Sequence, residues 1–126
     1  MPTPTEDRDE ILQLLYRYCH YIDSHRFEEW VSLFTDDGIF EHRGHVTTGS
    51  NDLMKIITST GHEVMRHLVS NPVIDIAGDS ARVHAYLTVM NGREIGSTGA
   101  YEDELVRTRQ GWRFARRLYI RDETPG

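Results

Sequence analysis

A single change in hydrophobic period constrains the fold of this chain more than any other feature. Up to about residue 59 the apolar residues recur at helical spacing, whereas from Val64 onward apolar and polar residues alternate as they do in strands. Helices first and hairpin-linked strands afterwards indicate an α+β fold, with the helices on one face of an antiparallel sheet. We expect this sheet to curl around the three N-terminal helices into a cone-shaped barrel with a pocket inside.

Cap and turn residues divide the helical part. A first helix is expected to start after Thr5, which can cap its free N–H groups, and to run to about Asp23. A second, short helix is predicted over residues 26–34, and a short strand over residues 39–42. Residues 44 and 47–49 are typical of a loop, and Ser50 is expected to cap a third helix over residues 51–59.

The alternating part predicts four strands, over residues 63–76, 81–90, 96–107 and 111–121. The turn residues that separate them are Gly78-Asp79, Asn91-Gly92 and Gln110-Gly111. Asn71-Pro72 predicts a bulge within the first of these strands. No repeat or linker interrupts the chain, and 126 residues are enough for one core, so we expect a single domain over residues 1–126.

Composition excludes several classes of protein. With 38% hydrophobic residues, and no apolar run near the roughly 20 residues of a spanning helix, we expect no membrane segment. A lone Cys19 cannot form an intramolecular disulfide and the N-terminus is acidic, so a cytoplasmic location is expected. Arginines and aromatic residues interleave between Arg107 and Arg121, as in some nucleic-acid-binding proteins. The net charge of −6 favours a solvated sheet face instead, so no nucleic-acid partner is expected.

Asp23 breaks two local rules at once. It lies at the margin of the apolar face of the first helix, where packing removes water from its carboxylate. It also lies at the C-terminal end of that helix, where the dipole disfavours a negative charge. Such residues collect at functional sites, which favours a general base or a histidine partner. The structural alternative is that Asp23 caps the following helix through the Ser24-His25 turn.

His67 is the histidine to which we assign chemistry. It shares a strand face with Met65 and Val69, while Arg66 points the other way. A lone histidine on an apolar face is usually a core residue, but a carboxylate partner would hold one ring nitrogen and free the other to take a proton. The remaining histidines are interpreted as surface or loop residues: His20, His25, His42, His45, His62 and His84.

The sequence contains no motif that supports metal or phosphate chemistry. His62 and His67 are five residues apart, whereas the zinc-protease motif needs a spacing of four on one helical face. Glu41, His42 and His45 surround a turn and fit a solvated loop better than a metal site. There is no glycine-rich phosphate loop before a helix and no Gly-x-Ser-x-Gly elbow, so we expect no metal and no cofactor.

Five short segments, in their order and spacing, resemble the SnoaL-like branch of the nuclear-transport-factor-2-like superfamily. They are Tyr18 with Asp23, residues 30–38 (WVSLFTDDG), residues 66–71 (RHLVSN), residues 99–101 (GAY) and residues 111–113 (GWR). Members of this branch resemble scytalone dehydratase, hexachlorocyclohexane dehydrochlorinase, bile-acid dehydratases and the small β subunits of ring-hydroxylating dioxygenases. The resemblance covers nearly the whole chain and implies an α+β cone with a deep apolar pocket.

The resemblance also implies roles for individual residues. Asp23 and His67 would form a dyad that removes a proton from the substrate, and Tyr18 would donate one to a carbonyl or leaving oxygen. Tyr18 and Asp23 lie about 140° apart around the helix, so they would reach one pocket only from its two sides. By pattern, the pocket residues, which fit a core equally well, are Trp30, Phe34, Met65, Val69, Tyr86 and Tyr101.

An arginine of the last strand would stabilise developing negative charge. Arg117 is the residue that the resemblance implies, five positions after Trp112 and on the opposite strand face from it by simple alternation. Arg116 and Arg121 remain alternatives.

The expected function is that of a cofactor-independent, dehydratase-like lyase or isomerase acting on a small, largely apolar cyclic compound. The alternative is a non-catalytic ligand-binding protein, or a structural subunit similar to the β subunit of a ring-hydroxylating dioxygenase. We also expect a homodimer, because a sheet with helices on one face leaves its other face to be covered.

Overall fold

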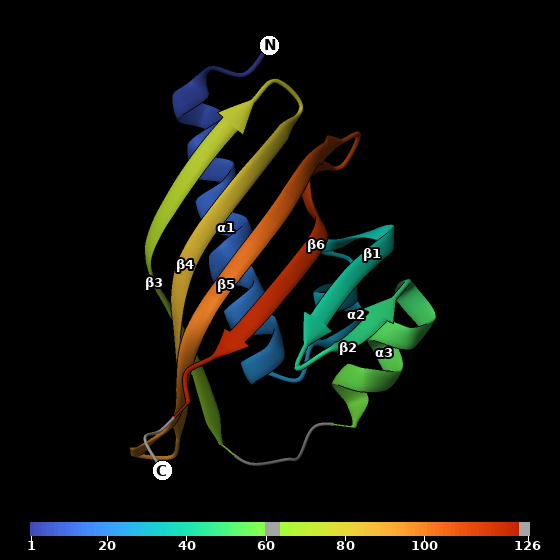
Figure 1. The fold of residues 1–126 in the computed structure, drawn as a ribbon. Helices are drawn as coiled ribbons and strands as arrows, with labels where there is room; N and C mark the ends of the chain where they lie inside the picture. Colours follow the sequence, from blue (N-terminus) through green and yellow to red (C-terminus); the bar gives the residue numbers. More distant parts are fainter. Residues whose placement is uncertain (60–63, 124–126) are drawn as a thin grey trace.

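The structure, a computed structural model, describes residues 1–59 and 64–123. Its elements in chain order are α1 (Pro4–Asp23), α2 (Phe27–Val31), β1 (Phe34–His42), β2 (His45–Thr48), α3 (Ser50–Thr58), β3 (Met65–Ala77), β4 (Ser80–Asn91), β5 (Glu94–Thr108) and β6 (Gly111–Arg121). A curved sheet wraps around α1, while α2 and α3 lie beside its β1–β2 end (Figure 1). The predicted α+β class is confirmed. The start predicted for the first long strand, at residue 63, lies outside the described residues.

Local chemistry explains both ends of α1. Thr3, rather than the expected Thr5, caps the helix by accepting the Glu6 N–H at 3.1 Å. Pro4 occupies the first turn, where its missing N–H costs no hydrogen bond. The helix ends at Asp23, as predicted.

The segment between α1 and β3 departs from the prediction. α2 is shorter than expected, β1 begins already at Phe34, and β2 forms where a loop was predicted. The reason is long-range pairing: β1 lies parallel to β6, and the Phe114 N–H donates to the Leu33 carbonyl at 2.9 Å. Ser50 opens α3 without a capping side-chain bond, and Gly49 with φ of 87° precedes it.

The six strands form one open sheet in the order β2-β1-β6-β5-β4-β3. The β1–β6 pair is parallel and all other pairs are antiparallel, so the expectation of a wholly antiparallel sheet is corrected. The sheet is curved as expected but does not close, because β2 and β3 remain as its two edges.

Register shifts interrupt four of the strand pairings, and two of these shifts bear on the candidate site. The predicted one is confirmed: the register of β3 against β4 changes between Ser70 and Val73. The second was not predicted, and lies in β6, where Arg116 pairs with Glu104 but Phe114 pairs with Leu105. Ala115 is therefore the extra residue, and side chains after it change face.

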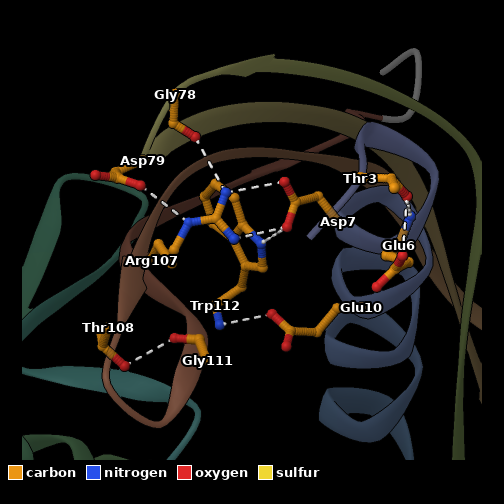
Figure 2. Close-up of polar contacts among 10 residues, drawn as sticks. All are labelled: Thr3, Glu6, Asp7, Glu10, Gly78, Asp79, Arg107, Thr108, Gly111 and Trp112. Carbon is orange, nitrogen blue, oxygen red and sulfur yellow. Dashed lines mark hydrogen bonds and ion pairs between the residues drawn. The ribbon is translucent and has the colours of Figure 1, made fainter. Parts of the chain in front are cut away.

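A polar clamp ties the start of α1 to the β5–β6 hairpin (Figure 2). The Arg107 guanidinium donates to both Asp7 oxygens at 2.6 and 2.9 Å and to Asp79 at 2.9 Å. It also stacks 4.6 Å from the Trp112 ring centroid, while the Trp112 indole N–H donates to Asp7 at 3.2 Å. These hydrogen bonds hold the pKa of Asp7 at about 2, below its usual 3.8.

Among the described residues, none of the helices has both the length and the apolar character needed to cross a membrane.

Candidate active site

Asp23 and His67 meet where α1 ends and β3 begins. The His67 Nδ1 lies 2.6 Å from Asp23 Oδ1, and the His67 backbone N–H donates to Asp23 Oδ2 at 2.9 Å. The side chains are only 9% exposed for His67 and 11% for Asp23. Both carboxylate oxygens are therefore committed to one residue, which fixes the histidine ring against the end of the helix.

This geometry contradicts the alternative that Asp23 caps the following helix. The residue at the N-cap of α2 is Arg26, and α2 has no capping side-chain bond. The Asp23 carboxylate serves β3 instead of the next helix. With Nδ1 donating to Asp23, the Nε2 atom of His67 carries the lone pair, and no described residue hydrogen-bonds to it.

The inner face of β3 surrounds the histidine with half-buried apolar side chains. Met65 and Val69 lie on the same face as His67, and the partner of His67 across the ladder is the buried Val89. The dyad therefore lies among mainly apolar side chains.

Tyr86 is not part of this interior. It is 52% exposed, since its neighbours Ala85 and Leu87 fill the inner face of β4 and alternation turns Tyr86 outward. The prediction that Tyr86 lines the pocket is wrong.

The remaining predicted pocket residues, apart from Met65 and Val69, are core residues. Trp30, Phe34 and Tyr101 are 2%, 5% and 2% exposed. Their rings pack around Tyr18, with centroid separations of 5.5, 6.3 and 5.7 Å. Tyr18 itself is 1% exposed, and burial raises the pKa of its hydroxyl while Arg117 partly offsets that rise.

Arg117 lies on the inner face, not opposite Trp112 as predicted, because the bulge at Ala115 shifts the alternation by one residue. It forms a fully buried ion pair with Asp103, at 2.8 Å between Nε and Oδ1 and 3.1 Å between Nη2 and Oδ2. Its guanidinium carbon lies 4.2 Å from the ring centroid of Tyr18. Its Nη1 is buried without a hydrogen-bond partner among the described residues.

The two alternative arginines lie elsewhere. Arg116 points to the other side of the sheet, where it donates to Glu41 at 2.9 Å, and Arg121 is exposed at the end of β6.

Asp103 was not predicted as a site residue, although the sequence contains a signal for it. It occupies the same strand face as the buried Tyr101 and Leu105, and a carboxylate there needs a cationic partner.

The interpretation of His42 as a surface or loop residue is also wrong. It is the last residue of β1, half-buried, with its ring 4.9 Å from that of Tyr119 and its Nε2 buried without a partner among described residues. Burial and the charges of Arg43, Arg121 and His45 lower the pKa of His42. The longer β1, paired with β6, is what brings this histidine inside. His62 lies outside the described residues.

Over residues 1–59 and 64–123, no three His, Cys, Asp or Glu side chains are grouped to hold a metal ion. The chemistry that the arrangement offers is acid–base chemistry by an oriented imidazole among apolar side chains. The Arg117 guanidinium lies in the core against Asp103 and Tyr18, and no hydrogen bond or ion pair joins it to the dyad among the described residues.

Comparison with known proteins places this geometry in a family. Uncharacterised proteins of Mycobacterium tuberculosis and Mycobacterium bovis are 30% identical over 124 residues, covering 89% of this chain and 83% of theirs. A protein of unknown function from M. tuberculosis has a similar structure, with a TM-score of 0.88 and 28% identity over 97% of this chain and 78% of that one.

Two further structures share the fold. A protein of Novosphingobium aromaticivorans that is described as similar to nuclear transport factor 2, with a cystatin-like fold, has a TM-score of 0.84 and 26% identity, covering 91% of this chain and 81% of that one. Another from the same organism, provisionally named a scytalone dehydratase, has a TM-score of 0.83 at 21% identity, covering 92% and 84%. The sequence profile of the SnoaL-like domain matches residues 3–118. With its nuclear-transport-factor-2-like fold, the chain belongs to the SnoaL-like domain family.

Proposed function

We propose that this protein is a cofactor-independent, dehydratase-like lyase or isomerase that uses the Asp23–His67 dyad to remove a proton from a small cyclic substrate. The observation that carries the proposal is the double contact of one carboxylate with one histidine, at 2.6 Å to the ring and 2.9 Å to the backbone. A purely structural role would not require an oriented ring nitrogen without a partner at an apolar interior.

In the proposed reaction the Nε2 atom of His67 takes a proton from a carbon next to an activating group. Asp23 keeps the ring in the required tautomer and stabilises the imidazolium that forms. In a dehydration the electron pair of the broken C–H bond forms a carbon–carbon double bond, and the hydroxyl group leaves as water after taking the proton from the His67 imidazolium or from Tyr18. In an isomerisation the electron pair is held in an enolate, and the His67 imidazolium returns the proton to another carbon.

Arg117 and Tyr18 would stabilise the oxygen that becomes negative. The unused Nη1 donor of Arg117 supports this role, since a buried N–H without a partner is costly unless a ligand or water completes it. Tyr18 packs against the same guanidinium, so substitution of either residue is expected to affect the other.

The test compares two histidine–carboxylate pairs in one protein. Asp23→Asn and His67→Ala are expected to lower kcat by about 10²- to 10⁴-fold on a cyclic β-hydroxy ketone or another substrate that the purified protein turns over. His84→Ala is the matched control, because His84 Nδ1 also contacts a carboxylate, Glu102 at 2.5 Å, but on the exposed outer face.

Full turnover in both dyad variants would contradict the proposed mechanism. The competing interpretation, a structural subunit similar to a dioxygenase β subunit, instead requires a stable complex with a larger enzyme subunit. An active protein without any such partner excludes that interpretation.

A further inference from the structure

A cavity opens at the end of β6, just beyond the last residue that pairs with β1. It measures about 550 Å³ and is lined by Arg43, Leu118, Tyr119, Ile120, Arg121, Asp122 and Glu123. The last β1–β6 pair is His42 with Tyr119, so the cavity lies next to the half-buried His42. Figure 1 shows the ends of β6 and α1 and the start of β3 at the same end of the sheet. The cavity and the dyad therefore share one end of the molecule.

Two arginines of this cavity are unpaired. Within the part of the chain that the structure describes, neither the Arg43 nor the Arg121 side chain forms a hydrogen bond or an ion pair. By contrast, Arg107, Arg116 and Arg117 each hold a carboxylate. Two free guanidinium groups at one cavity are suited to an anionic oxygen, because a guanidinium can donate two parallel N–H groups to a carboxylate.

The cavity also has two acidic residues, and they do not neutralise the arginines by contact. Asp122 accepts the Thr98 hydroxyl at 2.8 Å and so is turned towards β5. Glu123 is exposed and forms no ion pair with a described residue. Besides burial, the charges of Arg43, Arg121 and His45 lower the pKa of the adjacent His42.

The register of the sheet relates Arg121 to the strand that carries His67. Arg121 pairs with Gly99, Gly99 with Leu87, and Leu87 with Val69, which shares its strand face with His67. Three interstrand spacings separate Arg121 from Val69, or about 14 Å along the sheet. Gly99 is buried and Leu87 is 2% exposed, so this stretch of the inner face is covered, and a ligand at the cavity lies at the end of β6.

We propose that Arg43 and Arg121 bind the carboxylate of an acidic organic substrate at this cavity, with the apolar part of the substrate against Tyr119. The inference rests on the proposed function and adds the class of substrate: a small cyclic acid rather than a neutral compound.

Binding of 2-naphthoate, compared with its neutral analogue 2-naphthamide, tests this proposal by titration calorimetry. Arg43→Gln and Arg121→Gln are each expected to weaken naphthoate binding about tenfold, as expected for loss of a charge-assisted hydrogen bond, and to leave naphthamide binding unchanged. Arg109→Gln is the matched control, because Arg109 is an exposed arginine at the β5–β6 turn whose side chain forms no hydrogen bond or ion pair with a described residue.

The apparent pKa of His42, followed by NMR of its ring protons, should rise when naphthoate is bound, because the bound anion offsets the positive charges of Arg43, Arg121 and His45.

Equal binding of naphthoate and naphthamide, or equal losses in the Arg121→Gln and Arg109→Gln variants, would overturn the proposal. Failure of the dyad mechanism can be distinguished from failure of the carboxylate subsite. Asp23→Asn is expected to lower turnover but to keep the preference for naphthoate over naphthamide, because that preference depends on Arg43 and Arg121. If turnover of neutral substrates depends on the dyad while naphthoate does not bind, only the carboxylate subsite is wrong.

Discussion

A charged pair lies where the interior of the sheet would otherwise be apolar. The side chains of Arg117 and Asp103 are both 0% exposed, and two hydrogen bonds join them. Burial raises the pKa of Asp103, an effect that the Arg117 charge opposes. Taking two ions out of water costs several kcal/mol for each, and paired geometry of this kind is needed to offset that cost.

Removing one partner should therefore harm the protein more than removing both. We expect Asp103→Asn or Arg117→Met to lower the free energy of unfolding by about 3–5 kcal/mol, because each leaves a buried polar group without its partner. The double variant Asp103→Leu with Arg117→Met should lose less than either single variant. Urea denaturation measures all three, and simple additivity of the two single losses would contradict this account of the pair.

Local rules visible in the sequence draw attention to Asp23 and His67, and the family resemblance implied that the two pair. Asp23 is a carboxylate at the wrong end of a helix, and His67 is a polar residue among alternating apolar ones. The position of Arg117 was not predictable by alternation, because one extra residue, Ala115, reverses its face. Nothing in the local sequence of β6 marks that bulge as Asn71-Pro72 marks the one in β3.

At the scale of elements, the clamp of Figure 2 joins parts of the chain that are far apart in sequence. Asp7 on α1 contacts Arg107 and Trp112 of the β5–β6 hairpin, and Glu10 accepts the Trp112 backbone N–H at 2.9 Å. The clamp therefore fixes how α1 lies along the sheet, and hence where the helix delivers Asp23 at its other end.

Acid should release this clamp in a defined range of pH. The pKa of Asp7 in the folded protein is about 2, below its ordinary 3.8, so ionised Asp7 stabilises the folded state fully above about pH 4. That contribution is lost as the pH falls from about 4 to about 2. We expect Asp7→Asn to be less stable than wild type at pH 7 and to show a flatter decline in urea midpoint over this range. A matched variant, Asp9→Asn, should decline in parallel with wild type, and an unchanged slope in Asp7→Asn would contradict the assignment.

At the scale of the whole molecule, the outer face of the sheet is uncovered in the single chain. Leu68, Val73, Tyr86 and Ile120 are all about half exposed or more, at 52%, 57%, 52% and 49%, and lie on strands of this face. We propose that two copies of the chain pair through it, since exposed apolar side chains gathered on one face favour association.

Tyr86→Glu is expected to convert the dimer into a monomer, because it places an unpaired charge in the interface. Sedimentation velocity measures the outcome. The control is Tyr16→Glu, which alters a comparably exposed tyrosine, at 41%, on α1. A wild-type protein that sediments as a monomer at the concentrations of the assay would refute the pairing.

Short-range chemistry in the sequence determined the helices of the first half and the strands of the second half, the C-terminal end of α1, the bulge of β3 and the unusual position of Asp23. Each depends on periodicity, turn residues or a locally unfavourable charge, which neighbouring residues alone decide. The tertiary structure alone decided the parallel pairing of β1 with β6, the inward position of Arg117 and the partial burial of His42. The β1–β6 pairing, which also partly buries His42, joins segments nearly 80 residues apart, and the position of Arg117 follows from a bulge in the β5–β6 pairing. No local sequence pattern contains either register.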